Sequence, residues 1–187
     1  MPRDNRRNAG AKPRGAVASR GVAPGPEPHA SIAGDPVTIS FLNKVLKNEL
    51  TAINQYFLHS RILADWGLSH LAHKEYEESI DEMKHADKLS ERILFLDGLP
   101  NFQMLGKLRI GENPRELLEC DLTLELEGLP VLREAIAYCE TVSDYVSRQL
   151  FSDILESEEE HIDWIETQLS VIDRIGEPNY LLTKLED

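Results

Sequence analysis

Residues 78–87 read ESIDEMKHAD and contain Glu82 and His85, three residues apart. On a helix, side chains three residues apart share one face, so this carboxylate and this imidazole point the same way. Met83 lies about 100° round the helix from Glu82 and points elsewhere. The same Glu-x-x-His spacing recurs at residues 158–161.

Both Glu-x-x-His pairs lie within stripes of apolar residues spaced three and four apart, the pattern of an amphipathic helix. Two further stripes each contain one glutamate where a helical bundle normally has leucine or isoleucine. The four stripes are Leu42, Val45, Leu46, Glu49, Ile53 and Tyr56; Glu82, His85, Leu89, Ile93 and Leu96; Leu118, Glu125, Leu129, Leu132 and Ile136; and Phe151, Ile154, Glu158, His161, Ile165, Leu169 and Ile172. No alternation typical of β-strands occurs, which predicts an all-α fold.

Capping and helix-breaking residues indicate where the first two helices begin and end. Asp35 is suited to cap a helix that begins at Pro36 and ends near Gly67. A second helix is expected over about residues 70–96, because Gly98 and a proline two residues later stop it.

A long link separates these helices from the next pair. Residues 98–112 have little periodicity, and Asn113, followed by a proline and then a glutamate three residues on, restarts the helical pattern. A fourth helix is expected from near Ser143, and residues 180–182 are expected to form a short fifth helix at the C-terminus. The sequence therefore predicts a four-helix bundle with a long crossover between helices 2 and 3.

The four striped glutamates are symmetrically placed. Glu49 precedes Glu82 by 33 residues, and Glu125 precedes Glu158 by the same interval. Each half of the bundle thus supplies one lone glutamate and one Glu-x-x-His pair. A single pair is ordinary on the solvated face of an acidic chain. Two copies at equal offsets, both inside apolar stripes, indicate a metal site.

Charge balance favours two divalent cations at this site. Four buried carboxylates without counter-ions cost several kcal/mol each, whereas two divalent cations neutralise them. His85 and His161 stay neutral and complete the ligand set. Mixed carboxylate and imidazole ligands suit iron or manganese better than zinc or copper, and a bridging glutamate can hold two ions about 3.5–4 Å apart. This ligand pattern is that of the dimetal carboxylate bundles of the ferritin-like class.

The formal net charge of −13 is unevenly distributed. Residues 1–34, rich in Gly, Pro, Ala and Arg, carry six basic and two acidic side chains and are expected to be a disordered extension. Residues 35–187, expected to form the one bundle domain, carry a net charge of −17. A body this acidic repels nucleic acid and attracts cations, so nucleic acid is not an expected partner.

Apolar runs and cysteines indicate the compartment. No run of 18 apolar residues occurs, and the first thirty residues hold no apolar block, so neither a membrane span nor a secretory signal is expected. On one helix, Cys120 and Cys139 are about 28 Å apart, beyond the reach of a disulfide. Reduced thiols in a cytoplasmic protein are the expectation.

Four blocks of the chain, residues 49–59, 78–87, 92–96 and 161–164, resemble the bacterioferritins, and the likeness covers about residues 32–185. The resemblance implies a hollow shell of twenty-four subunits built from two-fold dimers. It also implies that the protein oxidises Fe(II) with O2 or peroxide, stores the ferric mineral, and receives electrons from a ferredoxin-type reductant.

The resemblance also implies residue roles at a non-haem di-iron centre. Its ligands would be Glu49, Glu82, His85, Glu125, Glu158 and His161. Glu82 and Glu158 would be the bridging pair. Tyr56 resembles the family's tyrosine beside the centre, with a core aromatic whose hydroxyl is satisfied as the equal alternative. Trp164 is expected to be core packing.

Met83 has two interpretations. From the residues alone, an outward thioether indicates interface packing. The resemblance implies instead that Met83 and its symmetry mate ligate one haem b across a two-fold axis, where one residue meets its own copy.

Two positions depart from the family pattern. Glu77 stands where some relatives have an iron-binding histidine on the inner surface, so that ligand is not carried over. Pro130, five residues after Glu125, removes one backbone hydrogen bond from the third helix and predicts a bend, with Gly128 beside it to absorb part of it.

Three other classes of protein are alternatives to a bacterioferritin. A rubrerythrin-type di-iron peroxidase needs a Cys-x-x-Cys pair, which Cys120 and Cys139 do not form. A DNA-protecting miniferritin builds its iron site between subunits, whereas this chain holds both Glu-x-x-His pairs. The ligands alone are also compatible with a manganese catalase. Measuring the metal content and the disproportionation of peroxide would distinguish the two classes.

Overall fold

The structure is a computed structural model that describes residues 33–185, so predictions for the extension before residue 33 lie outside it. The described residues form α-helices and no strand, which confirms the predicted all-α class. The helices are α1 (Pro36–Asp65), α2 (Ser69–Phe95), α3 (Pro114–Thr141), α4 (Tyr145–Ile175) and α5 (Glu177–Leu182).

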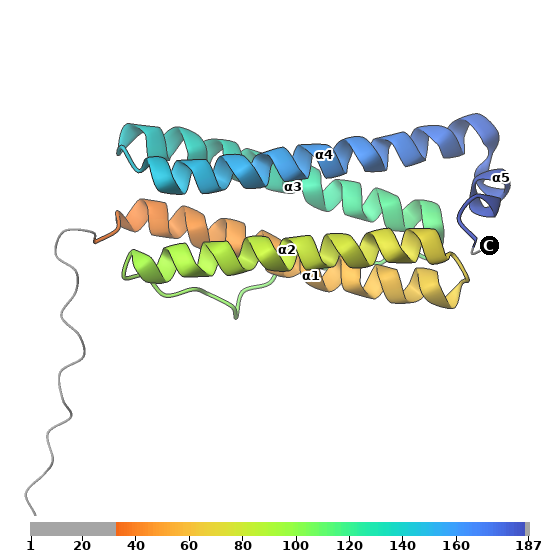
Figure 1. The fold of residues 1–187 in the computed structure, drawn as a ribbon, viewed down its shortest axis with the longest axis horizontal. Helices are drawn as coiled ribbons and strands as arrows, with labels where there is room; N and C mark the ends of the chain where they lie inside the picture. The colour runs from red at the N-terminus through yellow and green to blue at the C-terminus, as the bar shows by residue number, and fades with distance from the viewer. Residues whose placement is uncertain (1–32, 186–187) are drawn as a thin grey trace, which may run out of the picture.

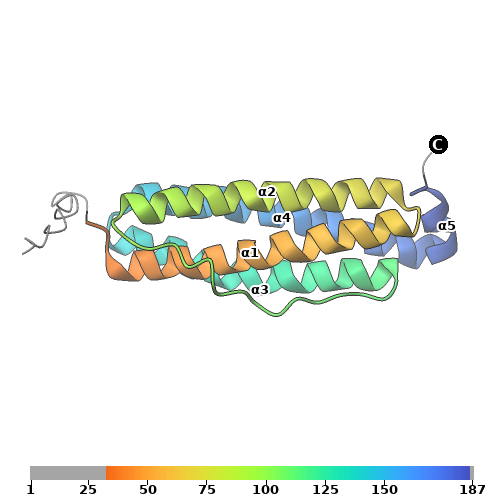
Figure 2. The same ribbon diagram turned by 90° about the horizontal axis from the view of Figure 1, so that it is seen from below.

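The four long helices lie side by side in one elongated bundle (Figure 1). α1 runs antiparallel to α2, and α3 antiparallel to α4, each pair joined by a short turn. Residues 96–113 form the crossover, which runs along the outer side of α1 and α3 from one end of the bundle to the other (Figure 2). α5 lies across the end of the bundle where α4 finishes. The predicted bundle, crossover and fifth helix are all confirmed.

Side-chain caps set the helix ends near the predicted positions. Asp35 accepts hydrogen bonds from the backbone N–H groups of the second and third residues of α1. Oδ1 of Asn113 accepts from the N–H of Glu116 at 2.9 Å. The Glu116 carboxylate accepts from the N–H of Glu112, one residue before the partner of a standard capping box. α4 begins at Tyr145, two residues after the predicted start.

Two apolar clusters form the core, one toward each end of the bundle. The first comprises Leu42, Val45, Leu46, Leu50, Ala86, Leu89, Ile93, Leu96, Leu132, Ala135, Cys139, Phe151 and Ile154; the second comprises Leu63, Leu68, Leu71, Ala72, Leu117, Leu118, Ile165, Ile172 and Tyr180. The middle segments of the long helices carry buried polar and charged side chains instead. Burying such groups is costly unless they are paired or bind ions, which draws attention to this central layer.

Polar side chains of α1 hold the crossover against the bundle. Oγ1 of Thr51 accepts a hydrogen bond from the N–H of Gly106 at 2.7 Å, and Oε1 of Gln55 accepts from the N–H of Arg109 at 2.8 Å. The crossover has no helical partners for these N–H groups, so the side chains of α1 satisfy them.

Pro130 does not end α3, which continues to Thr141. Because proline has no N–H, the carbonyl of Leu126 loses its helical donor. Leu126 lies on the exposed side of the helix, where water can replace that donor.

The two cysteines both lie on α3 and are free thiols, as their spacing predicts. None of the helices within residues 33–185 is both long enough and apolar enough to cross a membrane.

Candidate metal centre

All six predicted ligands come together in the middle of the bundle, between the two apolar clusters. They are Glu49 from α1, Glu82 and His85 from α2, Glu125 from α3, and Glu158 and His161 from α4. His85 is partly buried, and each of the other five is at most 5% exposed. Each glutamate occupies a core-facing position of its apolar stripe, and this position turns its carboxylate inward.

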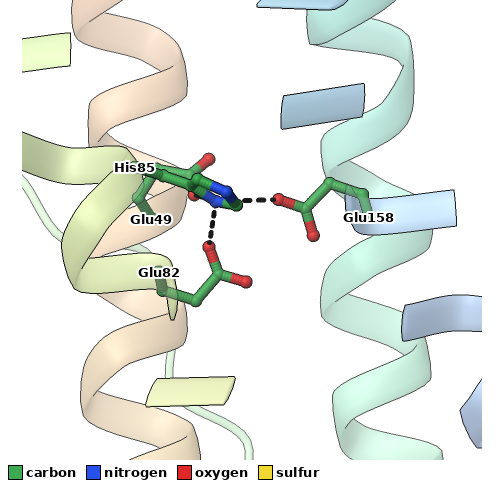
Figure 3. Close-up of side chains that lie close together, drawn as sticks. All are labelled: Glu49, Glu82, His85 and Glu158. Atoms are coloured by element: carbon green, nitrogen blue, oxygen red, sulfur yellow. Dashed lines mark hydrogen bonds and ion pairs between the residues drawn. The ribbon is translucent and has the colours of Figure 1, made fainter. Parts of the chain in front are cut away.

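Four of these side chains form a first group (Figure 3). The ligand atoms of Glu49, Glu82, His85 and Glu158 all lie within 4.8 Å of one another. Nδ1 of His85 is 3.1 Å from Oε2 of Glu82, 3.3 Å from Oε2 of Glu49 and 3.8 Å from Oε1 of Glu158. Figure 3 shows Glu158 reaching toward His85 from the opposite side of the group. The two helix pairs therefore meet at His85.

A second group contains Glu82, Glu125 and His161, again with ligand atoms within 4.8 Å of one another. Nδ1 of His161 lies 2.9 Å from Oε1 of Glu125. Glu82 belongs to both groups, and Glu158 of the first group is hydrogen-bonded to Glu125 of the second. The two carboxylates expected to bridge are thus the two that connect the groups.

Burial keeps protons on the carboxyls at the centre. Burial raises the pKa of Glu49 to about 7, although a hydrogen bond from Glu82 acts to lower it. Burial, followed by the charge of Glu49, raises the pKa of Glu82 well above its usual range. Burial, followed by the charges of Glu82 and Glu125, does the same for the pKa of Glu158. Without metal, therefore, Glu82 and Glu158 favour their protonated forms, which can donate hydrogen bonds to Glu49 and Glu125.

Glu125 and His161 behave in the opposite way. Burial acts to raise the pKa of Glu125, but hydrogen bonds from Glu158 and His161 outweigh it and the pKa is lowered. Burial acts to lower the pKa of His161, but its hydrogen bond to Glu125 and the charge of that carboxylate raise it. Both shifts favour a buried imidazolium–carboxylate pair when no metal is bound.

Two buried atoms of the cluster lack hydrogen-bond partners among the described residues, namely Oε2 of Glu49 and Nε2 of His161. A buried polar atom left in this way costs about 1–3 kcal/mol. Carboxylate oxygen and imidazole nitrogen are the donors that iron and manganese prefer in proteins. The cluster as a whole therefore fits a pair of such ions.

Two aromatic residues lie beside the cluster. The hydroxyl of Tyr56 donates a hydrogen bond to Oε1 of Glu125, and its ring meets the imidazole of His161 edge-on with ring centroids 5.4 Å apart. Trp164 is half-buried and stacks on His161 with centroids 6.2 Å apart. Tyr56 is thus a core aromatic with a satisfied hydroxyl whose partner is a predicted ligand.

A small cavity of about 20 Å³ reaches the cluster between α1 and α3. It is lined by Asn48, Glu49, Ala52, Glu82, Leu124, Glu125, Gly128, Leu132 and Glu158. Its volume is about that of one water molecule, so there is room for a small solute beside the carboxylates.

The outer face of α2 carries the side chains opposite the cluster. Met83 is 50% exposed whereas Glu82 is 3% exposed, so these adjacent residues lie on different faces of the helix. Phe57 of α1 and Tyr76 of α2 are also exposed apolar side chains. Glu77 is exposed as well.

The structure also shows a buried cluster that sequence reasoning missed. Ligand-type atoms of His59, Glu75 and Asp121 lie within 4.8 Å of one another, and all three side chains are fully buried. The sequence held a signal for two of them. Asp121 precedes Glu125 by one helical turn, and Glu75 precedes Glu82 by a heptad, so both face the core.

Comparison with known proteins agrees with this fold. Residues 39–175 match the ferritin-like domain family. The bacterioferritin of Rhodobacter capsulatus is 53% identical over 149 residues, which cover 80% of this chain and 92% of the relative. The bacterioferritin of Brucella melitensis is 51% identical over 147 residues (79% and 91% of the two chains), and that of Mycobacterium tuberculosis is 49% identical over 147 residues (79% and 92%). The chain belongs to the bacterioferritin family.

Proposed function

We propose that this chain is a subunit of an iron-storage protein that oxidises Fe(II). The six residues of the central cluster would bind two Fe²⁺ as substrate, with Glu82 and Glu158 bridging them. One observation supports this proposal above the others. A symmetric set of four carboxylates and two imidazoles is enclosed within a single subunit, and its middle carboxyls connect two groups of ligand atoms.

Charge accounts for the binding of Fe²⁺. Two Fe²⁺ bring four positive charges, which balance four ionised glutamates once Glu49, Glu82 and Glu158 have released their protons. His161 must also lose its second proton before its ring can bind a metal. Because binding displaces protons, the affinity for Fe²⁺ rises with pH.

The redox step balances with O2 or peroxide as oxidant. Each Fe²⁺ gives up one electron. O2 with two electrons and two protons becomes hydrogen peroxide, while hydrogen peroxide with two electrons and two protons becomes two waters. The chain contributes position and charge compensation, and Tyr56 holds Glu125 in place. The six positive charges of two Fe³⁺ exceed the four negative charges of the glutamates. This imbalance favours release of the Fe³⁺ into an acidic shell interior, where the mineral would grow.

Met83 would hold haem b together with the same residue of a second subunit. Its exposed thioether fits this role, since methionine sulfur is a known axial ligand of haem iron and exposed apolar side chains share the surface. Bound haem would supply electron transfer to the stored iron. A shell of twenty-four subunits built from two-fold dimers, a ferredoxin-type reductant and a cytoplasmic location belong to the same proposal, which the bacterioferritin relatives support.

Stopped-flow oxidation of Fe²⁺ tests the central claim. Glu82→Gln and His85→Ala should each abolish the rapid phase while size exclusion still shows an assembled particle. Glu91→Gln, an exposed carboxylate on the same helix, is the matched control and should leave the rate unchanged. An unchanged initial rate in both site variants would overturn the assignment. Tight binding of manganese with rapid O2 release from peroxide would instead identify a manganese catalase.

A further inference from the structure

The buried cluster of His59, Glu75 and Asp121 is separate from the six residues of the central cluster. It lies toward the α5 end of the bundle. Asp121 is four residues before Glu125 on α3, about 6 Å of helix rise. The three side chains come from α1, α2 and α3, and none is more than 1% exposed.

Neighbouring groups already hold two of these side chains in position. Nε2 of His59 lies 3.0 Å from the carbonyl oxygen of Arg109, which can only accept, so this nitrogen carries a proton and Nδ1 faces the cluster. Nδ1 of His59 is 2.9 Å from Oδ2 of Asp121, while the side-chain amide of Gln55 donates to Oδ1 of Asp121 at 2.8 Å. Hydrogen bonds of this kind orient histidine and carboxylate ligands in metal sites.

The burial of the Glu75 carboxyl is not explained by its neighbours. Its Oε2 is buried and has no hydrogen-bond partner within residues 33–185. The nearby cation Lys74 is paired with Glu78 instead. Burial, followed by the charges of Asp121 and Glu78, raises the pKa of Glu75 well above its usual range. A buried carboxyl with a free oxygen is less favourable here than leucine, and an ion is one of the groups that accounts for such an atom.

We propose that His59, Glu75 and Asp121 bind a third divalent transition-metal cation in each subunit. Two ionised carboxylates and one neutral imidazole balance a single divalent charge, and this donor set suits Fe²⁺ or Mn²⁺. The cation would take the place of the proton between His59 and Asp121 and use the free oxygen of Glu75. One part of this inference rests on the proposed function, namely that the bound ion is Fe²⁺ that will be oxidised one helical turn away. The binding of a divalent cation at this site does not depend on the proposed function.

Cobalt(II) serves as the probe, because it is stable in air and scatters anomalously. Metal-free full-length protein is dialysed against Co²⁺ and the metal bound per subunit is measured. Wild type should bind three tight equivalents and Glu75→Leu two. Glu82→Gln should lose ions of the central cluster but keep the third. Glu91→Gln again serves as the control for surface carboxylates and should keep three.

Crystals of the wild-type protein soaked in Co²⁺ give a measurement that needs no variant. An anomalous peak among His59, Glu75 and Asp121 is expected. Absence of this peak, or three equivalents retained by a folded Glu75→Leu protein, would overturn the proposal. If Glu82→Gln leaves every equivalent in place while Glu75→Leu removes one, the third site stands and the proposed di-iron centre fails.

Discussion

Tyr56 and Glu125, 69 residues apart in sequence, are joined by a buried hydrogen bond from the phenol hydroxyl to Oε1 of the carboxylate. The same oxygen lies 2.9 Å from Nδ1 of His161. Glu125 therefore receives hydrogen bonds from side chains of α1 and α4, and of the four cluster glutamates it is the one whose pKa is lowered. The bond links the two helix pairs at the candidate metal centre.

Replacing Tyr56 with phenylalanine tests the contribution of this bond. Hydrogen bonds to charged groups contribute about 1.5–3 kcal/mol, so Tyr56→Phe should destabilise the metal-free protein by about that amount. Rapid Fe(II) oxidation should slow less than in Glu82→Gln, because every proposed ligand remains. Thermal melting and stopped-flow absorbance measure the two effects. Tyr76→Phe, at an exposed tyrosine, is the control, and equal melting temperatures for both variants would contradict the argument.

The metal-free protein should lose stability as pH rises from about 5 to about 7. The carboxyl of Glu49 keeps its proton in the folded state up to a pKa of about 7, whereas in the unfolded chain it loses that proton near 4.5. The folded state thus binds more protons across this interval, so unfolding becomes more favourable as pH increases. Glu49 alone accounts for about 2 kcal/mol of this loss, and the raised pKa values of Glu82 and Glu158 add in the same direction.

Melting temperatures at several pH values, with and without a divalent cation, measure this effect. Saturating Co²⁺ should flatten or reverse the trend, because the bound cations stabilise the ionised carboxylates. Glu49→Gln should reduce the slope of the metal-free protein. A melting temperature that rises with pH in the absence of metal would contradict the protonation pattern derived for the cluster.

The fold and the central cluster could be predicted from sequence because each relied on repetition. The apolar stripes repeat through every long helix, and the interval between Glu49 and Glu82 recurs between Glu125 and Glu158. Helix ends were predictable for a local reason, since Asp35 hydrogen-bonds to backbone within three residues of itself. Patterns that are local or repeated need no knowledge of which helices are neighbours.

The cluster of His59, Glu75 and Asp121 has no such repeat. It forms because the crossover places the carbonyl of Arg109 against His59, and because α1, α2 and α3 meet there. Spacing within one helix does not reveal contacts between three helices. Nor does it show which carboxyls hold protons, since that depends on distances of a few ångströms and on burial.

Met83→Leu should remove haem without affecting Fe(II) oxidation. Leucine keeps the apolar volume but offers no sulfur ligand, while Glu82 and His85 face the interior of the bundle. The Soret absorbance of the purified particle measures haem content, and stopped-flow kinetics measure oxidation. Met104→Leu, at an exposed methionine of the crossover, is the matched control. Full haem content in Met83→Leu would show that another residue ligates the iron.

Pro130→Ala should stabilise the protein without changing its Fe(II) oxidation rate. Alanine restores the N–H that the Leu126 carbonyl lacks and favours a helix by up to about 3 kcal/mol, partly offset by a more flexible unfolded chain, so a gain of about 1–2 kcal/mol is expected. The rate should stay within about twofold, because hydrogen bonds from Tyr56 and His161, and not Pro130, hold the Glu125 carboxylate in position. Gly128→Ala provides a comparison, since the added Cβ would lie 3.8 Å from Nδ2 of Asn48, an ordinary contact. A loss of rapid oxidation in Pro130→Ala would show that the proline positions Glu125.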